Sequence, residues 1–172
     1  MIIKHTNEDF EYHWGFVDFN GKVVLDIGAD FGSTAECFLC YGAKKVIACE
    51  GDDVLYNKLL RYIDSEKEKG NDKIISYKRW INSETDFVHL LTNNWNGNKV
   101  DVVKIDVEGY EKYLLYVSKD VIRNIKEYVI ECHKNEIRDE LIKKFENSGF
   151  DIAKIIPLHV PGFSVIYIVR RD

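Results

Sequence analysis

Prolines and long apolar runs are scarce in this chain. Its 172 residues include two prolines and no low-complexity stretch, so we expect neither flexible linkers nor disordered segments. No apolar run approaches the roughly 18 residues that a membrane-spanning helix needs, and the opening residues lack a signal-peptide pattern. These absences favour one cytoplasmic globular domain with a sizeable core, and no membrane association.

Positive charge is not in excess either. The chain carries 24 Lys and Arg against 29 Asp and Glu, for a formal net charge of −5, and its basic residues are scattered. Because phosphate binding usually requires a basic face, nucleic acid is disfavoured as a partner, although a small basic patch remains compatible with this composition. Hydrophobic residues at 45% and charged residues at 31% are typical of soluble globular proteins.

Cysteine is too sparse for a disulfide framework. The four cysteines are Cys37, Cys40, Cys49 and Cys132. Cys37 and Cys40 form a C-x-x-C inside a predicted helix rather than at its first turn, where a thiolate would be stabilised. Buried packing is therefore favoured over a redox pair. A zinc site would need two further ligands at recognisable spacing, and none follows nearby.

The most informative stretch of the chain is a glycine-punctuated turn. Residues 23–32 read Val-Val-Leu-Asp-Ile-Gly-Ala-Asp-Phe-Gly, an apolar run that breaks into the turn. A second apolar run, 46–49, ends in Glu50, which lies 24 residues after Asp26. This is the frame of a nucleotide-binding βαβ unit, with an acidic residue placed to bind ribose hydroxyls.

Asp30 indicates which nucleotide. In a dinucleotide fingerprint this position is a glycine that lets the backbone approach a pyrophosphate, and a carboxylate there would be repelled by the phosphates. S-adenosylmethionine has no phosphate and carries a positive sulfonium. The acidic turn therefore favours S-adenosylmethionine over NAD.

Ligands of open α/β sheets bind outside the carboxyl ends of the strands, so the cofactor contacts should follow the strands. Gly28 and Gly32 allow a close backbone approach. Asp26 and Asp30 suit the methionine ammonium, Glu50 the ribose, and Trp80 with Ile81 the adenine. The alternatives are a turn-capping carboxylate for Asp26, a solvated strand end for Glu50 and a core role for Trp80. The full set of expected cofactor contacts is Asp26, Gly28, Ala29, Asp30, Gly32, Glu50, Gly51, Trp80, Ile81 and Asp106.

Two motifs carry a family resemblance. Asp26–Gly32, read as D-I-G-A-D-F-G, resembles the cofactor turn of S-adenosylmethionine-dependent methyltransferases. Lys104–Glu111, read as K-I-D-V-E-G-Y-E and about 78 residues further on, resembles a signature of the FkbM-type family, which includes O-methyltransferases. The resemblance runs from about Gly21 to His133 and implies a functional role for the Asp-Val-Glu-Gly segment. The family commonly has Asn where this chain has Asp30.

Acidic residues and one histidine follow the fourth and fifth expected strands. Asp106 and Glu108 lie two residues apart and would face the same side of an extended chain. Two converging carboxylates raise a pKa or attract a cation, whereas the alternative is a helix start that acids stabilise. Glu131 and His133 should share a side by the same alternation. We expect these four residues to be catalytic.

Strands and helices alternate from about residue 23. This pattern predicts an α/β, Rossmann-like, doubly wound seven-stranded sheet, mostly parallel, with one antiparallel strand near the C-terminus. Residues 1–20 are expected to form an N-terminal flap, and 21–172 the methyltransferase domain. The expected strands are 23–27, 46–49, 73–78, 100–105, 127–131, 150–156 and 163–169. The expected helices are 33–41 capped by Ser33, 53–69, 87–91 capped by Ser83 with Asp86, 111–124 with a break near Ser118, and 136–148.

Methyl transfer requires alignment of the acceptor, and an alcohol acceptor must also lose a proton to His, Asp or Glu. We therefore expect O-methyl transfer to a small hydroxylated acceptor, which the family resemblance suggests is a sugar or natural-product intermediate. One alternative is a metal-assisted version, with Asp106, Glu131 and His133 binding Mg²⁺, Mn²⁺ or Fe²⁺.

Further alternatives are a non-catalytic S-adenosylmethionine-binding module, or a subunit of a methyltransferase complex. No substrate-recognition domain is evident, so a second copy or a partner subunit is a candidate to complete the acceptor site. Nucleobase N-methylation is disfavoured, because the Asn/Asp-Pro-Pro-aromatic motif of those enzymes is absent after the fourth expected strand.

Overall fold

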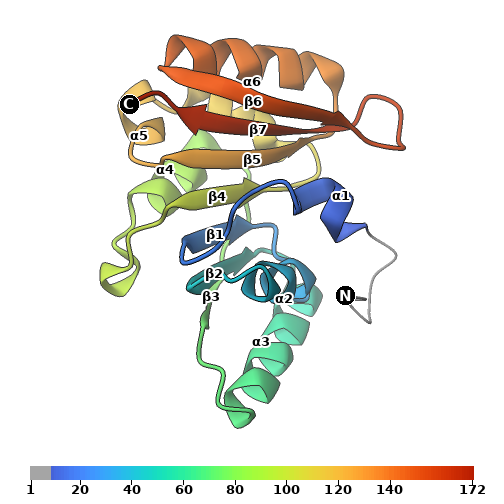
Figure 1. Cartoon of the computed structure of the whole chain (residues 1–172), viewed down its shortest axis with the longest axis vertical. Coiled ribbons are helices and arrows are strands. Elements are labelled where there is room, and N and C mark those ends of the chain that lie inside the picture. The colour runs from blue at the N-terminus through green and yellow to red at the C-terminus, as the bar shows by residue number, and fades with distance from the viewer. Residues whose placement is uncertain (1–8) are drawn as a thin grey trace. The chain divides into compact units, whose positions relative to one another are not determined.

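A computed structural model describes residues 9–172 (Figure 1). Seven strands form a sheet in the order β3-β2-β1-β4-β5-β7-β6, in which β7 runs antiparallel to both of its neighbours. The predicted Rossmann-like sheet with one reversed strand is thus confirmed. By its internal contacts the chain divides into two compact units, residues 1–80 and residues 81–172.

The regular elements follow the expected alternation closely. The strands are β1 (Val23–Ile27), β2 (Lys45–Glu50), β3 (Ile74–Lys78), β4 (Val102–Ile105), β5 (Glu127–Cys132), β6 (Phe150–Pro157) and β7 (Ser164–Arg170). The α-helices are α1 (Phe10–Trp14), α2 (Ser33–Cys40), α3 (Asp53–Glu68), α4 (Glu84–Thr92), α5 (Lys119–Ile122) and α6 (Asn135–Asn147). Two 3₁₀ helices complete the set, η1 (Trp95–Gly97) and η2 (Tyr110–Tyr116).

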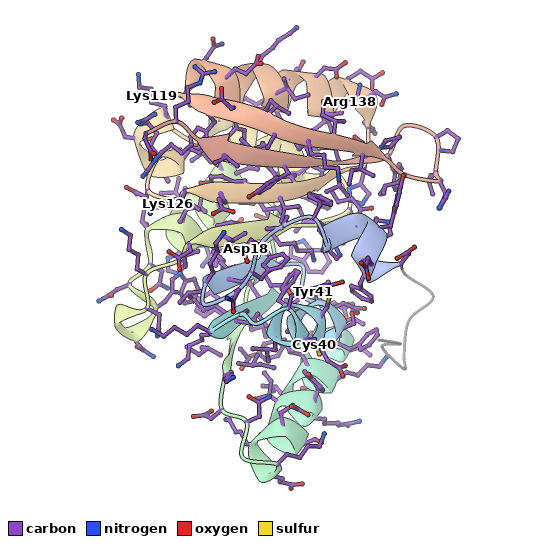
Figure 2. The ribbon with its side chains drawn as sticks, in the orientation of Figure 1. Asp18, Cys40, Tyr41, Lys119, Lys126 and Arg138 are labelled. Carbon is purple, nitrogen blue, oxygen red and sulfur yellow. The ribbon has the colours of Figure 1, made fainter. Side chains whose placement is uncertain are left out.

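In the first unit, β1 pairs in parallel with β2, and β2 with β3. Every residue of β1 is buried, as expected for strands of a parallel sheet covered on both faces. Leu59 of α3 and Phe38 of α2 are also buried. Helix α2 ends at the surface, where Cys40 is exposed and Tyr41 follows it (Figure 2).

In the second unit, β4 pairs in parallel with β5, and β6 and β7 form the predicted antiparallel hairpin. Helix α6 packs against both hairpin strands (Figure 1). Tyr128, Phe145 and Phe150 meet edge to face, with ring centroids 4.9 to 5.9 Å apart. Such aromatic contacts stabilise a core by about 0.5–1.5 kcal/mol beyond their buried area.

Three sequence expectations need correction. Ser33 does not cap α2: the cap is Gly32, at φ +101°, because the turn delivers the chain into the helix one residue earlier. The helix expected at 87–91 starts at Glu84. There Ser83 is the N-cap, but its hydroxyl donates to the Asp86 carboxylate and makes no side-chain bond to the helix backbone.

The helix expected at 111–124 is 3₁₀ over its first part. Its predicted break near Ser118 is confirmed, because Ser118 caps α5 by accepting from Val121 N at 3.4 Å.

The predicted flap over residues 1–20 lies partly outside the described residues, since residues 1–8 are not among them. Within the described part, α1 buries Phe10 and Trp14 and is capped by Asp9, whose carboxylate accepts from Tyr12 N. The flap remains a prediction. Within residues 9–172, no helix is long and apolar enough to cross a membrane.

Candidate functional site

The glycine turn of the first unit is tied to β2 at its start. The backbone N–H groups of Gly28 and Ala29 both donate to the carbonyl of Cys49, each at 3.0 Å. Gly28, Asp30 and Gly32 all have positive φ, at +82°, +51° and +101°. Glycine adopts such angles readily, whereas Asp30 does so at a cost of about 1–2 kcal/mol.

Glu50 stabilises the turn from the end of β2. Its carboxylate accepts from the backbone N–H of Asp30 at 2.9 Å, of Gly51 at 2.6 Å and of Asp52 at 2.8 Å. Only 9% of the residue is exposed, so Glu50 is not a solvated strand end. An ionised carboxylate offers about four acceptor positions, and three are used. By this count one position remains for a ribose hydroxyl.

Asp26 is fully buried at the other side of the turn. Its Oδ2 accepts a hydrogen bond from Thr34 Oγ1 at 2.5 Å, which joins the end of β1 to the first turn of α2. Sequence reasoning missed Thr34. The signal for it is a hydroxyl in the first turn of α2, within reach of a buried carboxylate at the end of β1.

Trp80 lies against the backbone of Gly51. A Cβ added to Gly51 would come within 2.6 Å of Trp80 Cα and 2.7 Å of Trp80 Cε3, so only glycine fits there. Trp80 is 53% exposed, which rules out a core role. The first unit thus presents an accessible aromatic ring against Gly51, whose backbone N–H donates to the Glu50 carboxylate. Ile81, in contrast, is buried in the second unit.

In the second unit, the chain leaves β4 through a tight turn. Glu108 and Gly109 have φ of +53° and +94°, two left-handed residues in succession. Nothing crowds Gly109, so its φ alone favours glycine there. The turn leaves the Glu108 side chain 86% exposed and the Asp106 side chain 26% exposed.

His133 is held by a buried carboxylate that sequence reasoning did not select. Glu111 is fully buried. Its Oε1 accepts from His133 N at 2.9 Å and lies 3.2 Å from His133 Nδ1, while its Oε2 accepts from Gly109 N at 2.8 Å. The rings of His133 and Phe163 meet edge to face, with centroids 4.8 Å apart. These contacts fix the imidazole and direct Nε2 away from Glu111.

The ionisation of this pair follows from its surroundings. Burial lowers the pKa of His133. The hydrogen bond and charge of Glu111, together with the charges of Asp106 and Glu108, raise this pKa by more than burial lowers it, so the net shift is upward. Burial raises the pKa of Glu111, and the hydrogen bonds from His133 outweigh it and leave the pKa below its usual value. The contact between Glu111 and His133 thus favours the charged form of each residue over its neutral form.

The four residues expected to be catalytic come together around His133 Nε2. Asp106 Oδ1 lies 3.6 Å from this atom, Glu108 Oε2 3.5 Å and Glu131 Oε1 4.0 Å. The fully buried Lys104 places its Nζ 3.7 Å from Asp106 Oδ2. Among residues 9–172, the group of side chains that could hold a cation is Asp106, Glu108 and His133. The metal-assisted alternative expected Glu131 where this group has Glu108.

Two viral proteins are similar to this chain in sequence, whereas no protein-family model matches it. The chain is 31% identical over 137 residues to uncharacterized protein 158B of Sulfolobus islandicus rod-shaped virus 1, a match that covers 79% of this chain and 77% of that protein. It is 28% identical over 151 residues to uncharacterized protein 65 of a Sulfolobus islandicus filamentous virus, covering 83% and 79%.

Solved structures show the same fold. A proposed RNA methyltransferase from Pyrococcus horikoshii superposes with a TM-score of 0.65 and 19% identity, over 95% of this chain and 80% of that one. A proposed tRNA (m1A22) methyltransferase from Streptococcus pneumoniae, in complex with S-adenosyl-L-methionine, gives 0.64 and 18%, over 92% and 71%. At these identities the likeness shows the Rossmann-like fold alone.

Proposed function

We propose that this chain, which belongs to the family of protein 158B of Sulfolobus islandicus rod-shaped virus 1, is an S-adenosylmethionine-dependent methyltransferase of the FkbM type. The reaction we propose is O-methyl transfer to a small hydroxylated acceptor, such as a sugar or a natural-product intermediate. The observation that carries the proposal is the Glu50 carboxylate, which has one acceptor position left, with the exposed Trp80 packed on the neighbouring Gly51.

The first unit supplies the proposed cofactor contacts. Glu50 binds the ribose hydroxyls and Trp80 stacks on the adenine. The carboxylates of Asp26 and Asp30 favour the positive charge of the methionine part. The remaining proposed contacts of this unit are Gly28, Ala29, Gly32 and Gly51 through their backbone. The absence of a phosphate in this cofactor agrees with an acidic turn.

The second unit supplies the groups that accept the acceptor's proton. Bound S-adenosylmethionine would supply the methyl group: as the acceptor oxygen bonds to the methyl carbon, the carbon–sulfur bond would break and leave its electron pair on sulfur, which gives S-adenosylhomocysteine. The hydroxyl proton leaves to the cluster of Asp106, Glu131 and His133. General base catalysis of this kind is worth about 10²–10⁴-fold in rate.

Two other functions compete with this proposal. Some solved structures with the fold are named as RNA or tRNA methyltransferases, but the net charge of −5 here disfavours a polyanionic acceptor. The second competitor is a non-catalytic S-adenosylmethionine-binding module, completed by a partner subunit or a second copy. The retained acid–histidine cluster argues against it.

A turnover assay tests the proposal. The purified protein is incubated with S-adenosylmethionine and a panel of sugars, polyols, phenols and tRNA, and S-adenosylhomocysteine is measured by mass spectrometry. We expect product with a small hydroxylated acceptor, and a loss of at least 10²-fold in Asp106→Asn. Product with tRNA alone would favour an RNA methyltransferase. Cofactor binding without product from any acceptor would favour the binding module.

A further inference from the structure

The imidazole of His133 stands in an arrangement typical of a metal ligand. Its Nδ1 contacts the buried carboxylate of Glu111, and its Nε2 faces the carboxylates of Asp106 and Glu108. Metal-bound histidines commonly use one ring nitrogen for the metal and the other for a carboxylate, which fixes the ring and its tautomer. The residue is 9% exposed, so this orientation is imposed by the core.

The distances agree with ligands around an ion. Nε2 lies 3.6 Å from Asp106 Oδ1 and 3.5 Å from Glu108 Oε2, beyond ordinary hydrogen-bond lengths. Metal–ligand bonds of about 2.0–2.2 Å place neighbouring ligand atoms roughly 3.0–3.6 Å apart. The ligand atoms of all three residues lie within 4.8 Å of one another.

The local charge also favours a cation. The carboxylates around the imidazole are those of Asp106, Glu108, Glu111 and Glu131. Against them stand the buried ammonium of Lys104 and, when protonated, the imidazole itself. An excess of carboxylates in a partly buried site is costly unless a positive charge compensates it.

We propose that Asp106 Oδ1, Glu108 Oε2 and His133 Nε2 bind a divalent first-row transition cation. A donor set of two carboxylates and one imidazole suits Mn²⁺, Fe²⁺ or Zn²⁺, whereas Mg²⁺ prefers oxygen ligands alone. Three protein ligands leave coordination positions for water or a hydroxyl. Glu111 lies behind His133 and positions it.

The consequence for catalysis rests on the proposed methyl transfer, whereas binding of the cation does not. A hydroxyl bound to a divalent cation loses its proton more readily. With His133 bound to the cation, the carboxylate of Glu131, 4.0 Å from Nε2, takes that proton. Bound S-adenosylmethionine would supply the methyl carbon for this oxygen, and the electron pair of the broken carbon–sulfur bond would stay on sulfur. The proposal thus divides the cluster into three ligands and one base.

Titration of the metal-stripped protein with MnCl₂ tests the site, without cofactor or acceptor. Calorimetry and the loss of the free Mn²⁺ electron paramagnetic resonance signal should both give one ion per chain. Parallel titrations with ZnCl₂ and MgCl₂ should show Mg²⁺ as the weakest. Tighter binding of Mg²⁺ than of Mn²⁺ would overturn the transition-metal assignment.

Variants distinguish this site from general attraction to an acidic surface. Glu108→Gln removes a ligand whose side chain is mostly exposed, so the fold should persist while Mn²⁺ affinity falls at least tenfold. Glu140→Gln, an equal change of charge at an exposed position of α6, is the matched control and should bind as wild type. Glu111→Gln should weaken Mn²⁺ binding about 10–100-fold by loosening the imidazole.

Two results would overturn the site: no Mn²⁺ binding by the wild type, or equal affinity in Glu108→Gln and Glu140→Gln. An S-adenosylmethionine titration of the same samples in EDTA separates this failure from failure of the proposed function. Cofactor binding without Mn²⁺ binding removes the cation site alone. Mn²⁺ binding without cofactor binding removes the proposed function and leaves the site.

Discussion

Both the backbone conformation and the close packing at position 32 require glycine, and the stability cost of each can be measured separately. Its φ is +101°, and an added Cβ would lie 2.6 Å from Tyr62 Cδ1 and 3.1 Å from Leu59 Cδ1. Gly70 also has a positive φ, +81°, but has open space around it. The two glycines therefore share the backbone requirement and differ in packing.

We expect Gly32→Ala to cost more stability than Gly70→Ala. Left-handed backbone alone costs a non-glycine residue about 1–2 kcal/mol, and overpacking against α3 adds about 1–3 kcal/mol. Urea denaturation of both variants gives the two free energies of unfolding. Equal losses would show that Tyr62 and Leu59 move aside without cost.

Glu108 has a backbone conformation that glycine would adopt more easily. Its φ of +53° costs about 1 kcal/mol or more, and such strain commonly persists where function needs it. Glu108→Gly should therefore raise the free energy of unfolding by up to about 1 kcal/mol while it abolishes the carboxylate's function. Thermal denaturation beside Glu108→Gln, which keeps the strain, checks this. A less stable glycine variant would contradict the account.

At the scale of elements, the two cysteines of helix α2 lie in different surroundings. Burial raises the pKa of the Cys37 thiol to about 12, helped by neighbouring Cys40 and Asp26. Cys40 is exposed at the end of the helix (Figure 2). Because the thiolate is the reactive form, the two thiols should differ strongly in reactivity.

Alkylation of the folded protein should modify Cys40 rapidly and Cys37, Cys49 and Cys132 slowly, since these three are buried. Mass spectrometry with iodoacetamide counts the modified thiols over time, and the denatured protein, with four reactive thiols, serves as the control. Rapid modification of both Cys37 and Cys40, or a disulfide between them, would favour the redox interpretation of the C-x-x-C.

Elements with strong local signals could be predicted from the sequence. The positive φ at Gly42 and Gly70 agrees with helices ending there, and the hairpin of β6 and β7 follows from its short turn. The 3₁₀ form of η2 could not be predicted. It depends on the left-handed pair at Glu108 and Gly109 and on the Glu111 carboxylate, which accepts from Gly109 N.

At the scale of the molecule, alternation along the chain predicted the seven-stranded sheet and its reversed strand. The same rule placed Asp106, Glu108, Glu131 and His133 at strand ends, and the structure brings them around one nitrogen atom. The Glu111–His133 contact joins residues 22 positions apart. The local sequence spacing could not predict this contact, because it forms only when η2 packs beside the end of β5.

Calorimetric titration with S-adenosylmethionine tests the central claim most directly, with NAD as the comparison ligand. Wild type should bind S-adenosylmethionine with micromolar affinity and give no heat with NAD. Glu50→Ala should abolish binding. Trp80→Ala should weaken it by about 1–3 kcal/mol, because the stacking of an aromatic side chain on a base contributes that much. Tyr116→Ala, another exposed aromatic, should bind as wild type. No binding by the wild type, or equal binding in Trp80→Ala and Tyr116→Ala, would contradict the account.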